Sequence, residues 1–243
     1  MLAKLSIKLK GANLNNNMSS LFHGYLMSII DSDYAEYLHY NMIKPFTSSV
    51  FKIDKSGEFV WRITTLNKLA YEKIILKILS DNIKQIEIKQ KNMIIDVEGM
   101  DLYTTDYDEL YNQEDNISRI RLITPTSYKT QGSIQIFPNI ATMIKGVINK
   151  INEHSDFIKL NDDNIIDELL DCAYIKDYSL RTQNFSLEGI KIKGFIGTID
   201  VFTKKDKLMI DLLNYVLRVS EYTGIGIKTS LGMGVVKIVE GRK

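Results

Sequence analysis

The sequence predicts an α+β fold made of two tandem ferredoxin-like (RRM-like) βαββαβ modules. Strand-like and helix-like apolar patterns follow one another in the order β, α, β, β, α, β twice along the 243 residues. This length suffices for two domains that each bury a core, and 44% hydrophobic with 25% charged residues is ordinary for a globular protein. We therefore expect one module at residues 1–116 and the other at 117–243.

The first half opens on a strand, because Leu5, Ile7 and Leu9 alternate with polar residues. Apolar residues between positions 21 and 30 then recur at helical spacing. Strands are expected next at 46–51 and 58–65, a helix at 67–80, and further strands at 86–88 and 93–97. The acidic, tyrosine-rich residues 101–116 show no apolar periodicity, which predicts a linker or an exposed short helix at the boundary.

The second half repeats the order. Strands are expected at 120–124, 134–137, 174–187, 190–202 and 235–239, and helices at 140–151, 164–172 and 207–222. The fold alone supports many unrelated functions, so function has to be argued from particular residues.

Charge and cysteine content limit the possible classes of protein. Lys+Arg 31 against Asp+Glu 30 gives a net charge of +1, so any surface for nucleic acid must be a local patch. The single cysteine, Cys172, and three scattered histidines offer no zinc-ligand spacing. We expect no metal and no cofactor, and a reducing, cytoplasmic location, since no signal peptide or membrane-spanning run is present.

The most distinctive stretch is residues 224–234, GIGIKTSLGMG, which holds four of the fourteen glycines. Glycine permits positive φ and leaves backbone N–H groups uncovered, so such a loop can lie against phosphates. A Walker A loop does not fit, because Ile227 separates Gly226 from Lys228 and the order is reversed. A dinucleotide fingerprint does not fit either, since a helix precedes the loop and a strand follows it.

A helix, two Gly-apolar-Gly pairs around a lysine, and a final strand resemble the signature of the RAMP superfamily of CRISPR-associated proteins. The whole chain resembles its repeat-RNA-processing endoribonucleases, the family called Cas six. Three further stretches agree with this resemblance: Leu38-His39 followed by Lys44-Pro45-Phe46-Thr47-Ser48-Ser49, Thr124-Pro125-Thr126, and Gly194-Phe195-Ile196-Gly197.

The resemblance implies metal-independent cleavage of precursor CRISPR RNA within the repeat. The 2′-OH of the nucleotide attacks the adjacent phosphate and leaves a 2′,3′-cyclic phosphate and a 5′-OH. This chemistry needs proton transfer and a cation for the charged phosphorane. The family pattern falls on His39 as general acid or base, Lys44 for the developing charge, and Tyr25 for orientation, with His23 as a competing candidate.

The RNA-binding residues are expected in the loop and on neighbouring strands. They are Gly224, Gly226, Lys228, Gly232, Gly234, Lys191, Lys193 and Ser48. Other cations of the second half considered for phosphate contacts are Arg119, Arg121, Lys129, Lys145, Arg181 and Arg218. Lys191 and Lys193 share one strand face by the two-residue period, which makes them the more specific pair.

Each assignment has a structural alternative. Tyr25 falls on the apolar helix face and suits the core, Lys44 precedes a proline at a strand entry, and the loop suits a plain helix-to-strand turn. The expected partner is CRISPR repeat RNA, with subunits of a CRISPR effector complex as possible further partners. The competing functions are a non-catalytic RAMP subunit that holds guide RNA and a general single-strand RNA-binding module.

Overall fold

The structure is a computed structural model that describes residues 1–243 except 12, 54–55, 114–116, 204–206 and 241–243. The contacts between Cα atoms divide the chain into two compact units. The first comprises Met1–Thr104 and Ser230–Gly232, and the second comprises Thr105–Thr229 and Met233–Lys243. The segment Ser230–Gly232 thus belongs to the first unit although it lies near the end of the chain.

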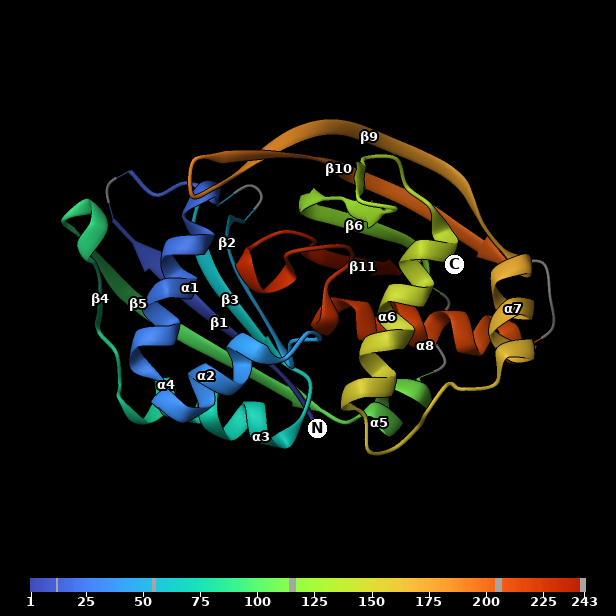
Figure 1. Ribbon diagram of the computed structural model, residues 1–243, viewed down its shortest axis with the longest axis horizontal. Helices are drawn as coiled ribbons and strands as arrows, with labels where there is room; N and C mark the ends of the chain where they lie inside the picture. The colour runs from blue at the N-terminus through green and yellow to red at the C-terminus, as the bar shows by residue number, and fades with distance from the viewer. Residues whose placement is uncertain (12, 54–55, 114–116, 204–206, 241–243) are drawn as a thin grey trace. The chain divides into compact units, whose positions relative to one another are not determined.

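The first unit is built around a five-stranded sheet in the order β2-β3-β1-β5-β4 (Figure 1). Strand β1 pairs antiparallel with β3, and β3 pairs antiparallel with β2. The strands are β1 (Leu2–Lys10), β2 (Phe46–Lys52), β3 (Phe59–Thr65), β4 (Gln85–Ile88) and β5 (Met93–Thr105). The helices are α1 (Ser19–Ile29), α2 (Ser32–Tyr40), α3 (Lys68–Ala70) and α4 (Lys77–Ser80), with the π-helical turn η2 (Tyr71–Leu76) and the short 3-10 turns η1 (Asn16–Met18) and η3 (Lys89–Lys91).

The core of the first unit forms where α1 meets the sheet. Trp61 of β3 is fully buried, and its ring packs edge-on against Phe22 at 5.2 Å and Tyr25 at 6.1 Å between centroids. Its indole N–H donates to Ser48 Oγ at 2.9 Å. Buried tryptophans usually find such a partner, because an unpaired N–H in an apolar core costs free energy.

The second unit contains a four-stranded sheet in the order β11-β6-β10-β9. Its strands are β6 (Ile117–Thr126), β9 (Ala173–Leu187), β10 (Ile190–Thr203) and β11 (Val236–Glu240), and β7 (Tyr128–Thr130) and β8 (Ser133–Gln135) form a separate hairpin. The helices are α5 (Tyr107–Tyr111), α6 (Ile140–His154), α7 (Asp163–Cys172) and α8 (Lys207–Thr223), followed by the 3-10 turn η4 (Thr229–Leu231). Strands β9 and β10 run side by side as one long hairpin (Figure 1).

Both sheets have the strand order of the ferredoxin-like fold, in which the last strand lies beside the first. In the first unit β5 lies beside β1, and in the second unit β11 lies beside β6. Strand β4 and helix α2 are additions to this plan in the first unit. The predicted α+β class with tandem ferredoxin-like modules is confirmed.

One predicted element differs from the structure. Residues 101–116 were expected to form a linker or an exposed short helix, but 101–105 continue β5, and α5 buries Tyr107 and Leu110. Helix α5 packs on α8, where Tyr111 meets Tyr215 edge-on at 5.5 Å. Residue 116, where the sequence placed the boundary, lies outside the described residues, and the first unit ends at Thr104.

None of the helices in the described part of the chain has both the length and the apolar character needed to span a membrane.

Candidate functional site

His39 lies in the last turn of α2, a helix with defined caps at both ends. Asp31 precedes the helix, and its carboxylate accepts from the Tyr34 N–H at 3.0 Å. At the other end the Lys44 ammonium donates to the carbonyls of Leu38, His39 (3.0 Å) and Asn41 (2.5 Å). The last carbonyls of a helix have no partner within the helix, and a cation suits the negative end of its dipole.

Lys44 therefore fixes the backbone that carries His39. Partial burial lowers the pKa of its ammonium group. An ammonium has three N–H donors, and three carbonyls accept them here. Its donors thus hold the end of α2, and the predicted role of Lys44 in stabilising developing charge stays a prediction.

A pocket of about 300 Å³ lies beside this turn, within the first unit. The volume is at the small end of the range for ligand sites. Its polar side chains are His23, His39, Lys44 and Ser230. The apolar part of the wall comprises Met27, Ala35, Leu38, Phe46 and Leu231. The pocket combines two imidazoles and one cation with apolar walls, which suits a planar group attached to an anion.

The two histidines differ in their surroundings. His39 is exposed, and its ring meets Tyr40 edge-on at 5.4 Å. His23, on α1, is half-buried and stacks parallel to Phe46 at 5.9 Å. The structure thus brings the predicted pair His39 and Lys44 together with the competing candidate His23.

Tyr25 and Ser48, two other predicted site residues, make packing contacts in the core of the first unit. Tyr25 packs against Trp61, and it does not occur among the described residues that line the pocket. Burial raises the pKa of its hydroxyl, with Asp81 adding to the effect. Ser48 is fully buried and accepts from Trp61, so the expectation that it contacts RNA is wrong for this structure. The hydroxyl of Ser48 satisfies the indole instead.

The glycine loop, residues 224–234, is packed into the protein. The N–H groups of Ile225, Ile227 and Gly234 donate to the carbonyls of Gly234, Ser127 and Pro125, respectively, at 2.9–3.1 Å. A Cβ on Gly226 would lie 2.4 Å from the Ser127 carbonyl oxygen, and one on Gly234 would lie 2.0 Å from that of Ile225. These glycines are required because other backbone segments lie against them.

This packing corrects the expected role of the loop glycines. Gly224, Gly232 and Gly234 are buried, so they do not present their amides to a phosphate chain. Gly226 is half-buried, and Lys228 is exposed with a left-handed backbone, φ 57°. The part of the loop that reaches solvent is centred on Lys228.

Two of the stretches that carried the resemblance, 124–126 and 194–197, lie beside this loop. Thr124 accepts from the Val235 N–H through its hydroxyl at 2.9 Å, and Pro125 accepts from Gly234. A Cβ on Gly194 would lie 2.7 Å from the Thr126 carbonyl oxygen. Their shared function is to let β6, β10 and the loop approach one another closely.

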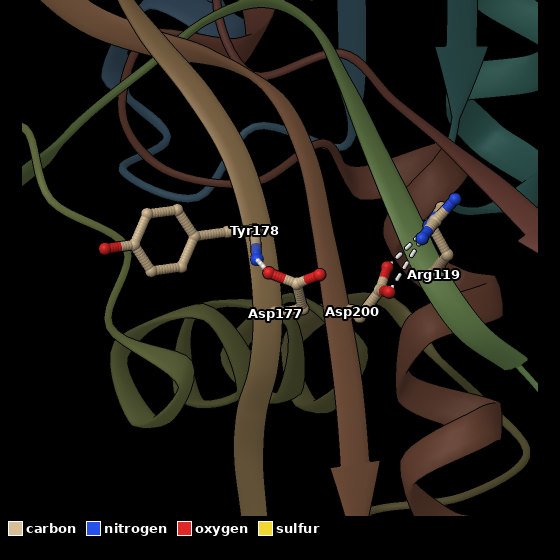
Figure 2. Close-up of polar contacts among 4 residues, drawn as sticks. All are labelled: Arg119, Asp177, Tyr178 and Asp200. Carbon is tan, nitrogen blue, oxygen red and sulfur yellow. Dashed lines mark hydrogen bonds and ion pairs between the residues drawn. The ribbon is translucent and has the colours of Figure 1, made fainter.

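The remaining predicted cations differ in availability. Lys191 and Lys193 are both exposed on β10, as expected from the two-residue period. Arg119 forms a bidentate ion pair with Asp200, at 2.5 and 2.7 Å, beside Asp177 and Tyr178 (Figure 2). Asp200 raises the pKa of Arg119, and Arg119 lowers that of Asp200. Arg218 is buried and donates to the Leu110 carbonyl at 3.1 Å.

Among the residues that the structure describes, no three His, Cys, Asp or Glu side chains gather closely enough to hold a metal ion.

The fold and the pocket define a protein with two ferredoxin-like modules and a histidine-lined site on the first. A family profile described as CRISPR-associated endoribonuclease Cas6 matches residues 120–236. A CRISPR-associated endoribonuclease Cas6 of Streptococcus thermophilus is 29% identical over 223 residues, 90% of each chain. One of Mycobacterium tuberculosis is 22% identical over 222 residues, which cover 89% of this chain and 70% of that protein.

A solved structure described as a Cas6 product complex shares the fold, with a TM-score of 0.84, 18% identity, and coverage of 98% of this chain and 100% of that one. The chain is similar in sequence to the Cas6 family of CRISPR-associated endoribonucleases, and it shares the fold of solved Cas6 structures.

Proposed function

We propose that this protein cleaves precursor CRISPR RNA within the repeat, without a metal ion. The 2′-OH of one nucleotide attacks the adjacent phosphorus, the bond to the 5′-oxygen breaks, and the products carry a 2′,3′-cyclic phosphate and a 5′-OH. The observation that carries the proposal is the pocket lined by His23, His39 and Lys44 in a chain similar to the Cas6 family. The Cas6 relatives named above are endoribonucleases.

His39 is the group proposed for proton transfer. It is exposed, borders the pocket and sits on a turn whose backbone is fixed, so its imidazole reaches a bound nucleotide from a defined position. Histidine suits this role because its ordinary pKa, about 6.5, is close to physiological pH. His23 faces the same pocket and is the alternative for the second proton transfer, since the reaction needs both a base and an acid.

Lys44 supports the reaction in two ways. Its ammonium holds the carbonyl of His39, and its charge lies at the wall of the pocket where a phosphate would sit. A positive charge in partly buried surroundings stabilises a developing negative charge without a direct hydrogen bond. Tyr25 has no part in this proposal because it packs against Trp61.

The RNA outside the pocket is proposed to contact exposed cations of the second unit. Lys228 in the loop and the pair Lys191 and Lys193 on β10 are the candidates. Lysine binds phosphates as a point charge, so these contacts would provide affinity more than sequence selection. Solved Cas6 structures include one described as a substrate mimic complex.

The test is incubation of the purified protein with the CRISPR repeat RNA of its own genome in the presence of EDTA. Cleavage at one position with 2′,3′-cyclic phosphate and 5′-OH ends is expected. A repeat with a single 2′-deoxy nucleotide at the scissile position is the matched control, and it should bind and stay intact. Cleavage of the deoxy substrate, or loss of activity in EDTA, would rule out the mechanism.

A further inference from the structure

The strongest feature that the proposed function leaves unused is Lys150 on α6. Its ammonium donates to the carbonyl of Thr223, the last residue of α8, at 2.5 Å, and to Thr229 Oγ1 at 3.0 Å. Thr223 immediately precedes the glycine loop, and Thr229 lies in its middle. A single side chain from another helix thus joins the start and the centre of the loop, all within the second unit.

Thr229 is the residue around which the loop closes. It is buried, and its γ-methyl would lie 2.9 Å from a Cβ on Gly224 and 3.1 Å from a Cβ on Gly234. The glycines therefore leave space for the methyl group of Thr229, while the Lys150 ammonium donates a hydrogen bond to its hydroxyl. Rotation of this side chain would both open a gap beside the glycines and break the bond to the ammonium.

The bond to Thr223 has a second effect. The last carbonyls of a helix lack partners within the helix, and a cation there offsets the negative end of the dipole. Lys150, which lies on α6, provides this cation and donates to the Thr223 carbonyl of α8. The direction in which the chain leaves α8 therefore depends on α6. Burial of the ammonium group lowers the pKa of Lys150 to about 7.

We propose that Lys150 is a positioning residue for RNA binding, which holds the glycine loop so that Lys228 is presented to RNA. This inference rests on the proposed function, because it assumes that the loop contacts the repeat. Lys150 itself does not reach the RNA or the reacting atoms. Its removal should weaken binding and leave the chemical step at saturating RNA unchanged.

The test compares Lys150→Met with Lys207→Met. Methionine keeps the apolar stem and removes the donors. Lys207 is an exposed lysine at the start of α8, in the same unit, so the charge change is identical. The dissociation constant is measured with the repeat RNA that is 2′-deoxy at the scissile position, and the single-turnover cleavage rate is measured at saturating repeat RNA. Hydrogen exchange of the Ile225, Ile227 and Met233 amides reports the loop without RNA.

We expect Lys150→Met to raise the dissociation constant about 10-fold, the effect of losing roughly one charged hydrogen bond, with a cleavage rate within about 2-fold of wild type. The three loop amides should exchange faster, and Lys207→Met should change neither the dissociation constant nor the loop exchange. Equal affinity and equal loop exchange in the two variants would overturn the proposal.

A second variant covers the case in which Lys150→Met does not fold. Thr229→Val keeps the shape of the side chain and the charge of Lys150 but removes the acceptor hydroxyl. It should weaken binding in the same direction, and unchanged affinity and loop exchange would overturn the proposal. If the wild-type protein does not bind repeat RNA, the proposed function is contradicted. Faster loop exchange in the variants would in that case still show that Lys150 orders the loop.

Discussion

The pocket of the first unit and the glycine loop, most of which belongs to the second unit, are held in place by different means. His39 is an exposed side chain on a short helix, and its position depends on local hydrogen bonds from Lys44. In the loop the backbone itself is buried, and its position depends on segments about a hundred residues away in the sequence, such as Pro125 and Ser127. A lysine at a helix end occurs in both, Lys44 at α2 and Lys150 at α8.

Because the two sites are held differently, substitutions in them should change different properties of the protein. Around the pocket, a changed side chain should alter the chemistry and leave stability almost intact. In the loop, a changed residue should first alter packing, and RNA binding only as a result. The four predictions that follow test this division, from the largest expected effect to the smallest.

The substitution His39→Ala should give the largest change. We expect single-turnover cleavage of repeat RNA to fall by about 10³-fold, within the range for loss of a general acid or base, with RNA affinity unchanged. Glu36→Ala, an exposed change on the same helix, should cleave at the wild-type rate. Full activity of His39→Ala would remove this residue from the mechanism, and the same assay on His23→Ala would then identify the alternative.

In the loop, Gly234→Ala should destabilise the second unit by roughly 3 kcal/mol or more, because its Cβ would lie 2.0 Å from a backbone oxygen at φ 73°. The matched control is Gly132→Ala, which has φ 81° and no atom within 4 Å of the added Cβ. The control should cost only about 1 kcal/mol of backbone strain. Urea unfolding followed by circular dichroism measures both, and equal losses would contradict the packing argument.

Lys44→Met is expected to slow cleavage about 10-fold at saturating RNA, because α2 loses the ammonium that satisfies its carbonyls and the His39 backbone becomes less defined. Binding should be affected little. Lys52→Met, at an exposed lysine of the same unit, serves as the control. A large loss of affinity with an unchanged rate would instead assign Lys44 to RNA binding.

The smallest effect concerns pH. Burial lowers the pKa of Lys150 to about 7, against an ordinary value near 10.5, so between these values the unfolded chain binds more protons than the folded one. The free energy of unfolding should therefore rise from pH 7 to pH 9, by about 1–2 kcal/mol after allowance for partial solvent access. Urea titrations should show this rise in wild type and a smaller one in Lys150→Met. Identical slopes would contradict the lowered pKa.

The sequence predicted most of the fold because its elements carry local patterns. Leu5, Ile7 and Leu9 mark β1, and the two long strands of the hairpin were expected almost to the residue. Helix α5 was not recognised as buried, because its two core residues, Tyr107 and Leu110, lie among acidic neighbours. Two buried positions are too few to establish a helical period.

The candidate site was predicted in part. The histidine and the lysine that resemble the family pattern do meet at one pocket, and their roles stay predictions. Ser48 was misplaced because β2 is buried on both faces, which removes the alternation that separates inner from outer residues. The packing contacts of the loop glycines and of Lys150 could not be predicted from the sequence. Their partners come from distant segments, and no local pattern encodes such contacts.

Trp61 has a further consequence for spectroscopy. It is the single tryptophan of the chain and lies fully buried in the first unit, hydrogen-bonded to Ser48. Its fluorescence therefore reports the folding of the unit that carries the pocket, while circular dichroism reports both units. Where the two signals separate during denaturation, the emission curve gives the stability of the first unit without any added label.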